Sequence, residues 1–239
     1  IQREMPRLHR ARTWQAAEVA RAKRIHITPV AASGVADKAE YAMRAMAAAT
    51  QSPLRITGAP VADMRMILHQ FARLGVTVEA NGKKNELLVT GRKRLTVRED
   101  IGGAIPKIED SPWPGFPADL MPIMLITATQ ARGTCLIHEK MFEARLFYVD
   151  KLIDMGARIV LCDPHRAVVA GPAALHGMTI SSPDIRAGMA LLIAALCAEG
   201  TSTIYNAEQI DRGYQRIDKR LAACGARIKR TAERRKRGK

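Results

Sequence analysis

Three polar clusters interrupt the apolar pattern of the sequence, and the first is DSPWPGFPADL at residues 110–120. Its three prolines and one glycine predict an irregular loop. Asp119 then lies at a predicted helix start, and Pro122 falls in the first turn, where a missing N–H group costs little. Two interpretations of the Asp119 carboxylate remain open: a helix cap, or a base that accepts a proton from a substrate hydroxyl group.

The other two clusters place charged side chains at a helix start and beside a glycine. In SSPDIR (181–186), Asp184 lies at another helix start and Arg186 follows two residues later. Arginine binds phosphate and carboxylate groups bidentately and helix N-termini favour anions, so this pair suits an anionic ligand. In IDRGYQRI (210–217), Arg212 precedes a glycine, which lets the backbone approach a ligand. The alternative is a capping aspartate with two solvated arginines.

An internal repeat must position these clusters. Three segments share the order apolar helix, strand, second helix, glycine and strand, and their first helices begin near Asp37, Ala118 and Pro183. The second helices end alike, in FARLGVTVEA, LIDMGARIVL and LAACGARIKR, at Gly75, Gly156 and Gly225. A glycine there adopts the left-handed conformation that ends a helix without steric cost.

The repeat also predicts individual elements. Apolar residues recur at steps of three and four over 142–155, which predicts an amphipathic helix. Asn-Gly at 81–82 and the segment at 162–166 each predict a hairpin turn. The third unit turns basic after Ile228 and lacks its last strand pair. The basic segment 1–24 fits none of this and predicts a linker or a polar helix.

Together these elements predict an α/β domain with pseudo-threefold symmetry and three inward helices that are apolar nearly all round. Asp119 and Asp184 begin equivalent helices of successive repeats. Packing should therefore bring both helix starts to one end of the domain, where two carboxylates and two arginines converge. Such a site suits a phosphorylated or carboxylated ligand.

Composition limits the classes of protein to which the chain can belong. The chain has 239 residues and is 47% hydrophobic, which is enough for a core and argues against disorder. The longest apolar run, 189–198, is shorter than the roughly 18–20 residues of a membrane helix, and no secretory signal is visible. The four cysteines have no metal-binding spacing and predict free, buried thiols in a reducing cytoplasm.

The net charge of +15 is concentrated at the ends of the chain. Residues 1–24 carry +5 and residues 227–239 carry +7, which leaves only +3 on the body. Such tails predict salt-dependent attraction to a nucleic-acid backbone.

Four segments resemble the C-terminal half of the UDP-N-acetylglucosamine 1-carboxyvinyltransferases, which belong to the EPSP synthase superfamily. They are DSPWPGFPADL, EKMFEARLFYVDKLIDMGARI, SSPDIRAGMALLIAALCAEGT and QIDRGYQRIDKRLAACGARI. The resemblance implies one of the family's two inverted α/β barrel domains, each built of three βαβαββ units. It sets a transferase domain at 25–230, with repeats at about 25–100, 101–175 and 176–230, between the segment 1–24 and a basic tail at 231–239.

The resemblance also implies an activity: the enolpyruvyl group of phosphoenolpyruvate moves to the 3′-hydroxyl of UDP-N-acetylglucosamine and phosphate leaves. This is the first committed step of peptidoglycan synthesis, in the cytoplasm. By correspondence, Asp119 is the candidate base on the 3′-hydroxyl and Asp184 is a second aspartate of proton transfer. Arg186 and Arg212 correspond to arginines that contact phosphoenolpyruvate.

Met141, with Phe142 beside it, corresponds to the position whose backbone touches the sugar and diphosphate of UDP-N-acetylglucosamine. No metal and no cofactor is implied. The family's active site lies between two domains, so a further domain, in cis or in trans, is expected to supply the rest.

Two hypotheses follow. The chain is either half of an enolpyruvyl transferase, or a non-catalytic nucleic-acid-binding or scaffold protein built on a degenerate transferase domain with basic tails. The retained aspartates and arginines and the nearly neutral body favour the enzyme.

Overall fold

The computed structural model describes residues 12–17, 25–27, 54–90, 94–143, 145–214, 216–223 and 226–232. The strands are β1 (Arg12–Ala17), β2 (Ile25–Ile27), β3 (Leu54–Thr57), β4 (Thr77–Asn81), β5 (Glu86–Thr90), β6 (Leu95–Thr96), β7 (Lys107–Glu109), β8 (Ala131–His138), β9 (Ile159–Leu161), β10 (Arg166–Gly171), β11 (Thr179–Ser181), β12 (Thr201–Tyr205) and β13 (Arg227–Ala232). The α-helices are α2 (Arg65–Arg73), α3 (Met121–Thr129), α4 (Val149–Asp154), α5 (Ile185–Cys197), α6 (Glu208–Asp211) and α7 (Ile217–Ala223). Short 3₁₀ turns are η1 (Val61–Met64), η2 (Ile101–Gly103) and η3 (Ala118–Leu120).

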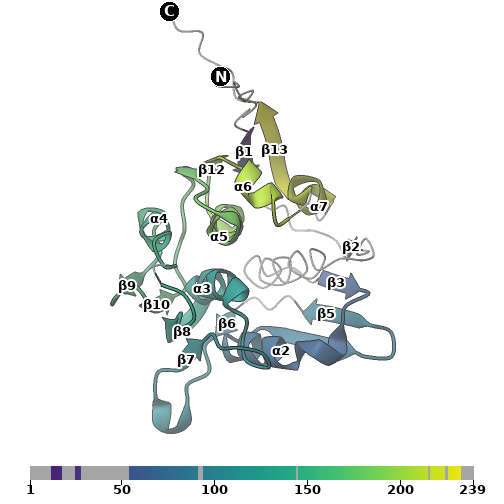
Figure 1. Cartoon of the computed structure of the whole chain (residues 1–239), viewed down its shortest axis with the longest axis vertical. Coiled ribbons are helices and arrows are strands. Elements are labelled where there is room, and N and C mark those ends of the chain that lie inside the picture. The colour runs from purple at the N-terminus through teal and green to yellow at the C-terminus, as the bar shows by residue number, and fades with distance from the viewer. Residues whose placement is uncertain are drawn as a thin grey trace, which may run out of the picture.

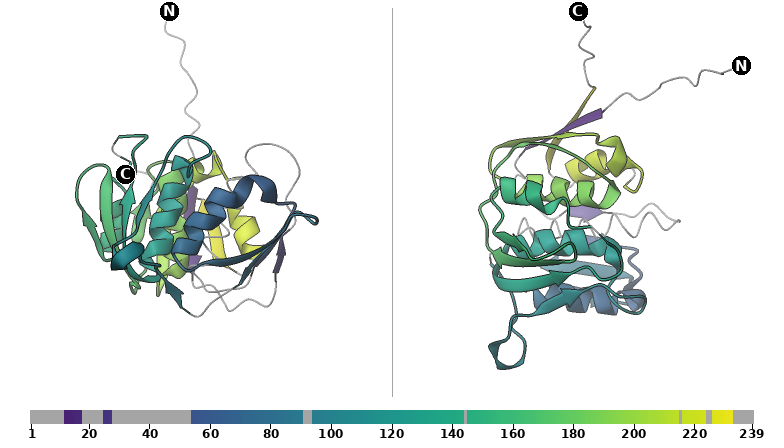
Figure 2. Two further views of the ribbon diagram at one scale, coloured as in Figure 1. Left: turned by 90° about the horizontal axis from the view of Figure 1, so that it is seen from below. Right: turned by 60° about the vertical axis from the view of Figure 1, so that its left-hand side comes forward.

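The strands form three sheets that share one pairing pattern (Figures 1 and 2). A parallel pair comes first, and two antiparallel pairings follow, in the orders β2-β3-β5-β4, β7-β8-β10-β9 and β11-β12-β1-β13. In the second sheet, β6 also pairs with the beginning of β8. This repetition confirms the α/β fold with pseudo-threefold symmetry that the sequence predicts.

The third sheet takes its third strand from the beginning of the chain. β1 lies between β12 and β13 and is antiparallel to both, with Trp14 opposite Ile204 on one side and Arg230 on the other. The expectation of a linker or helix over 1–24 is therefore wrong for residues 12–17. So is the expectation of an incomplete third unit. The segment RTWQAA is too short and polar to predict a strand by itself, and its partners lie at the other end of the sequence.

Two interior helices connect the second and third units. Every residue of α3 is buried, as are Ala187–Leu196 of α5, and the two helices pack against each other. These helices confirm the prediction of apolar inward elements. No helix in the described part of the chain is long and apolar enough to cross a membrane. The corresponding helix of the first repeat, expected after Asp37, lies outside the described residues.

Two glycines end their helices as predicted. Gly75 follows α2 with φ +82° and Gly156 follows α4 with φ +100°. A Cβ atom at Gly75 would lie 2.6 Å from the backbone nitrogen of Thr96, so the neighbouring strand β6 also requires glycine there. Gly225, the third member of the set, lies outside the described residues.

The second helix of the middle repeat is shorter than expected. The predicted helix over 142–155 is reduced to α4, and the residues before it form turns. Leu152 is buried as predicted, but Phe142 and Ile153 are exposed by 43% and 41%. The guanidinium group of Arg145 lies 3.8 Å from the centre of the Phe142 ring, so this aromatic residue contacts a cation instead of the core.

Three smaller expectations are also settled. The hairpin turn at 162–166 connects β9 to β10, as predicted. The β4–β5 hairpin forms, but through residues 82–85 and with Asn85 at φ 49°, because residue 81 still belongs to β4. The cysteines are free, yet Cys162 is exposed, so burial holds for Cys135 and only partly for Cys197. Cys224 lies outside the described residues.

Candidate active site

The loop at 110–120 is fixed at both ends. Phe116 is buried and packs edge-on against Phe71 of α2, with ring centres 6.4 Å apart. The side chain of Asp110 is fully buried, and its two oxygens accept hydrogen bonds from the backbone N–H groups of Lys140 (2.5 Å) and Met141 (3.4 Å). The loop therefore holds the backbone of residues 140–141 while it leads into η3 and α3.

Asp119 does not cap a helix. It lies inside η3, one turn before α3, whose N-cap residue is Leu120 and has no side-chain cap. The Asp119 carboxylate instead forms an ion pair with the Nε atom of Arg186. Both side chains are about one-third exposed, so a ligand can reach them.

Asp184 does cap its helix, as one of the two interpretations held. Its Oδ1 accepts hydrogen bonds from the N–H groups of Arg186 (2.7 Å) and Ala187 (2.8 Å), the first residues of α5. The start of α5 thus fixes Arg186, and Arg186 in turn contacts Asp119. The predicted convergence of Asp119, Asp184 and Arg186 is present in the structure.

Arg212 lies at the end of α6, where its side chain is exposed and donates to Gln209 Oε1 at 3.1 Å. Among the described interactions it does not touch Asp119, Asp184 or Arg186. The segment that carries it is nevertheless seated on the start of α5, because a Cβ atom at Gly213 would collide with the side chain of Ile185.

An ion pair and a buried tyrosine secure that segment. Arg230 of β13 binds both carboxylate oxygens of Asp211, at 2.9 and 2.6 Å. Tyr214, two residues after Arg212, is buried, and burial together with the nearby Asp119 carboxylate raises the pKa of its hydroxyl group well above the ordinary value. The α6 turn therefore borders the Asp119–Arg186 pair.

Met141 and Phe142 lie on the surface, at 41% and 43% exposure. Asp110 holds the backbone of Met141, and Arg145 covers one face of the Phe142 ring. Exposed apolar side chains on a fixed backbone suit contact with a ligand, which is the position that the sequence resemblance assigns to them.

Three polar residues near the site were missed by the sequence reasoning: Glu139, Arg145 and Tyr148. Glu139 and Tyr148 are each only 1% exposed. Burial, reinforced by the Asp110 carboxylate, raises the pKa of Glu139 to about 7. The segment HEKMFEAR resembles an ordinary charged turn. Only its position directly after a buried strand could have drawn attention to Glu139.

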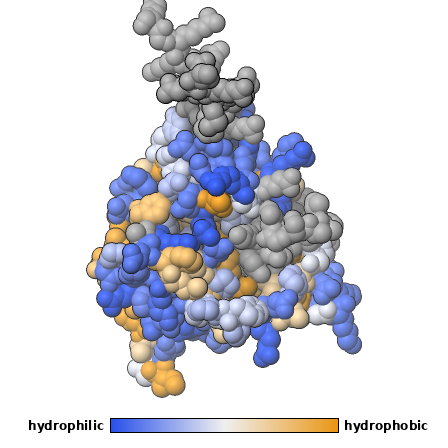
Figure 3. Space-filling model, in the orientation of Figure 1, coloured by the Kyte–Doolittle hydropathy of each residue, from blue (hydrophilic) through white to orange (hydrophobic). Residues whose placement is uncertain are grey.

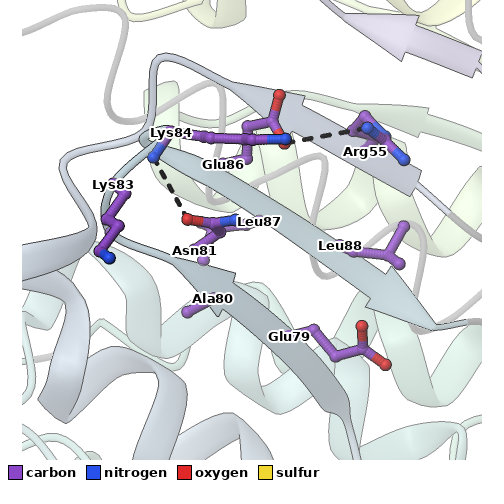
Figure 4. Close-up of a pocket in the computed structure, with 10 residues that line it drawn as sticks. Arg55, Glu79, Ala80, Asn81, Lys83, Lys84, Glu86, Leu87 and Leu88 are labelled. Atoms are coloured by element: carbon purple, nitrogen blue, oxygen red, sulfur yellow. Dashed lines mark hydrogen bonds and ion pairs between the residues drawn. The ribbon is translucent and has the colours of Figure 1, made fainter.

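One hollow of the surface is separate from these residues. A polar hollow on the β4–β5 hairpin is lined by Arg55, Asn81 and Glu86 among others, and contains none of the predicted site residues (Figure 4). Within the described ranges, no group of three His, Cys, Asp or Glu side chains could hold a metal ion.

Comparisons with known proteins assign the family. The sequence profile described as EPSP synthase (3-phosphoshikimate 1-carboxyvinyltransferase) matches residues 23–221. The chain belongs to this family of carboxyvinyl transferases.

Two relatives of higher identity carry a more particular name. The UDP-N-acetylglucosamine 1-carboxyvinyltransferase of Bradyrhizobium diazoefficiens is 59% identical over 189 residues, which cover 79% of this chain and 43% of that protein. The Treponema denticola protein of the same name is 54% identical over 183 residues, or 77% of this chain and 42% of that protein. The chain thus spans less than half the length of these relatives.

Solved structures agree on the fold. The enolpyruvyl transferase NikO from Streptomyces tendae matches with a TM-score of 0.70 at 25% identity, over 83% of this chain and 45% of that one. An EPSP synthase from Acinetobacter baumannii matches with a TM-score of 0.62 at 16% identity, over 81% and 46%. These matches show the fold, which both hypotheses share, whereas the relatives at 59% and 54% identity favour the enzyme over the nucleic-acid scaffold.

Proposed function

We propose that this chain supplies one part of an enzyme that transfers the enolpyruvyl group of phosphoenolpyruvate to the 3′-hydroxyl of UDP-N-acetylglucosamine. The observation that carries the proposal is the ion pair between Asp119 and Arg186, which joins a candidate base to a candidate anion-binding group. The names of the relatives at 59% and 54% identity support the same substrate. A further domain, in cis or in trans, supplies the other side of the cleft.

In the proposed reaction, Asp119 accepts the proton of the 3′-hydroxyl as that oxygen bonds to C2 of phosphoenolpyruvate. C3 gains a proton at the same stage, which gives a tetrahedral ketal. The ketal then loses phosphate from C2 and a proton from C3, so that the enolpyruvyl ether remains. Asp184 is the proposed second group of proton transfer, and its carboxylate is already held at the start of α5.

Arg186 and Arg212 bind the anionic groups in this proposal. A guanidinium group matches phosphate and carboxylate oxygens bidentately, and the N-terminus of α5 adds a favourable field. Arg186 would exchange its Asp119 contact for phosphoenolpyruvate, which frees the Asp119 carboxylate for the sugar. Met141 and Phe142 are proposed to contact the sugar and diphosphate of UDP-N-acetylglucosamine.

This activity would place the protein in peptidoglycan synthesis in the cytoplasm, and so in cell-wall biogenesis, cell shape, the cell cycle and cell division. No observation on the described residues favours nucleic-acid binding, because the basic tails lie mostly outside them.

The test is phosphate release from phosphoenolpyruvate and UDP-N-acetylglucosamine. The 239-residue chain is mixed with the part of the Bradyrhizobium diazoefficiens relative that this chain does not match. Release by the mixture, lost in Asp119→Asn and kept in the surface control Glu199→Gln, supports the proposal. Full turnover by Asp119→Asn would remove Asp119 as the base. A mixture without release that also fails to bind UDP-N-acetylglucosamine would contradict the proposed function.

A further inference from the structure

Arg230 forms a bridge between two carboxylates that lie on either side of Arg212 in the sequence. Its Nη1 and Nη2 atoms donate to the two carboxylate oxygens of Asp211, at 2.9 and 2.6 Å. Its Nε atom lies 3.4 Å from Oδ2 of Asp218. The Arg230, Asp211 and Asp218 side chains are 22%, 25% and 16% exposed, so salt and water screen these contacts less than contacts on an open surface.

The bridge closes the turn between α6 and α7. Asp211 is the last residue of α6 and Asp218 lies in the first turn of α7, so one guanidinium group holds both ends of the segment 211–218. Figure 1 shows α6 and α7 beside β13, the strand that carries Arg230. A helix as short as α6 is not stable by itself and depends on contacts of this kind.

The backbone of this turn places Arg212. Arg212 directly follows Asp211, its side chain is exposed, and its described hydrogen bond goes to Oε1 of Gln209, within the same turn of helix. The next residue, Gly213, lies against the side chain of Ile185 at the start of α5. The direction of the Arg212 side chain therefore depends on a backbone that Arg230 holds from the other side.

Arg230 also controls the charge next to Arg212. It binds both oxygens of Asp211, so this carboxylate is already occupied. Without Arg230, the carboxylates of Asp211 and Asp218 would attract the Arg212 guanidinium group and repel the phosphate and carboxylate groups of a ligand. Lysine is an incomplete replacement for Arg230, because an ammonium group is a point charge and cannot bind a carboxylate bidentately.

The first strand of the chain sets the position of Arg230. β13 is the edge strand of the third sheet and lies next to β1. The antiparallel register between them extends along the whole of β13, with Trp14 of β1 opposite Arg230. The strand that completes the sheet is thus next to the residue that closes the turn.

We propose that Arg230 is a positioning residue of the anion site, which holds Arg212 in place for phosphoenolpyruvate and keeps the Asp211 carboxylate away from it. This inference rests on the proposed function, because it takes Arg212 as a group that binds phosphoenolpyruvate. It adds a residue that does not touch the substrate and that connects the anion site to the third sheet. Loss of the bridge should weaken the binding of phosphoenolpyruvate and leave that of the nucleotide sugar unchanged, because the proposed contacts of the sugar lie elsewhere.

The experiment is phosphate release by the full 239-residue chain, mixed with the part of the Bradyrhizobium diazoefficiens relative that it does not match. The KM is measured for each substrate separately. Arg230→Lys should raise the KM for phosphoenolpyruvate about tenfold and leave the KM for UDP-N-acetylglucosamine unchanged, since a charge-assisted hydrogen bond is lost. Lys229→Met removes a whole charge from the exposed face of the same strand and should behave like the wild type.

A double variant tests whether Arg230 acts through Arg212. Arg212→Lys alone should raise the KM for phosphoenolpyruvate, and adding Arg230→Lys should raise it no further. If Arg230→Lys fails to fold, Asp218→Asn removes one side of the bridge and should raise the same KM by a smaller factor. Independent effects of the two arginines, equal increases for both substrates, or an unchanged KM in Asp218→Asn would overturn the inference and leave the proposed function intact.

Hydrogen exchange of the 239-residue chain without substrate gives a readout that does not depend on activity. The N–H groups of Gly213 and Tyr214 donate to the carbonyl oxygen of Ile210 at 3.1 and 2.9 Å. Arg230→Lys should speed the exchange of both groups, while β8 in the second sheet exchanges as in the wild type. Unchanged exchange in the turn would show that the bridge does not hold it, and would overturn the inference.

Failure of the proposed function has a different signature. A wild-type mixture that neither releases phosphate nor binds UDP-N-acetylglucosamine contradicts the proposed function. The role of Arg230 in phosphoenolpyruvate binding is then contradicted with it, whatever the exchange in the turn.

Discussion

The second and third sheets have the same strand pattern but obtain it in different ways. In the second sheet, β10 follows β9 through a tight turn, so two neighbouring strands come from one stretch of chain. In the third sheet the equivalent strand is β1, which reaches β12 and β13 from the opposite end of the sequence. The sheets are thus alike in geometry, but only the third depends on a contact between distant parts of the chain, which costs more loop-closure entropy.

The starts of helices α3 and α5, which lie beside these sheets, also differ although they occupy corresponding places in the repeat. Asp184 of the third unit is used to cap α5, whereas Asp119 of the second unit leaves α3 uncapped and pairs with Arg186. Corresponding helix starts therefore hold one carboxylate that caps a helix and one that forms an ion pair with Arg186. The second unit also holds the buried acid Glu139.

The largest effect is expected from breaking β1. A proline at Gln15 removes an N–H group from a strand that has neighbours on both sides, and should cost about 3 kcal/mol. Hydrogen exchange should rise in β12 and β13 while β8 and β10 stay protected. Gln15→Ala keeps the N–H group and should leave both patterns unchanged. Equal protection of β12 in the proline variant would show that β1 does not hold the third sheet.

A pH effect on stability is expected from Glu139. Its pKa is raised from 4.5 to about 7 in the folded chain, so the folded state binds this proton more tightly than the unfolded state. The stability that the proton provides is complete below about pH 4.5 and is lost as the pH rises through about 7, in total on the order of 3 kcal/mol.

Urea unfolding of wild type and Glu139→Gln across this pH range measures the difference between their free energies of unfolding. The variant should gain stability relative to the wild type as the pH rises. Parallel curves for the two proteins would mean that Glu139 ionises normally.

The two helix starts should respond in opposite ways to removal of their carboxylates. Asp184→Ala deletes the α5 cap and should cost about 1 kcal/mol. Asp119→Ala removes no helix cap and breaks a part-exposed ion pair with Arg186, so its cost should stay within about 0.5 kcal/mol. Thermal unfolding of both variants gives the comparison, and a larger loss at Asp119 would contradict the assignment of roles.

The smallest effect concerns Tyr148. Its hydroxyl group is buried without a partner among the described residues, so Tyr148→Phe should leave stability unchanged or raise it by up to about 1 kcal/mol. Tyr205→Phe, on the exposed face of β12, is the matched control and should change nothing. A clear loss of stability at Tyr148 would reveal a bond to its hydroxyl group.

Most of the fold could be predicted from local sequence patterns. The glycines at 75 and 156 and the all-apolar helices near Met121 and Met189 revealed the repeat, because helix caps and buried helices are encoded within a few residues. What could not be predicted depends on distant partners. β1 is recognisable as a strand only once β12 and β13 are in place. The ion pair of Asp119, for which the sequence left a cap and a base open, could not be predicted because its partner Arg186 lies 67 positions further along.

An exposed apolar turn is a further feature that no local pattern indicated. η2 projects below β7 in Figure 1, and Ile101 and Ile105 on and beside it are exposed, which gives the apolar tip visible in Figure 3. Single exposed apolar side chains are common on protein surfaces. The two isoleucines lie together here because the positive φ angles of Gly102 and Gly103 turn the chain outward.

The place of β1 also sets the order in which the molecule can be completed on the ribosome. A growing chain is extended by roughly 5–20 residues each second, so β1 is made on the order of ten seconds or more before β12. The second sheet can close as soon as its hairpin is made. β1 must wait, unpaired, for β12 and β13, so the growing chain exposes a strand edge that chaperones can bind, or that can aggregate, until those two strands have been made.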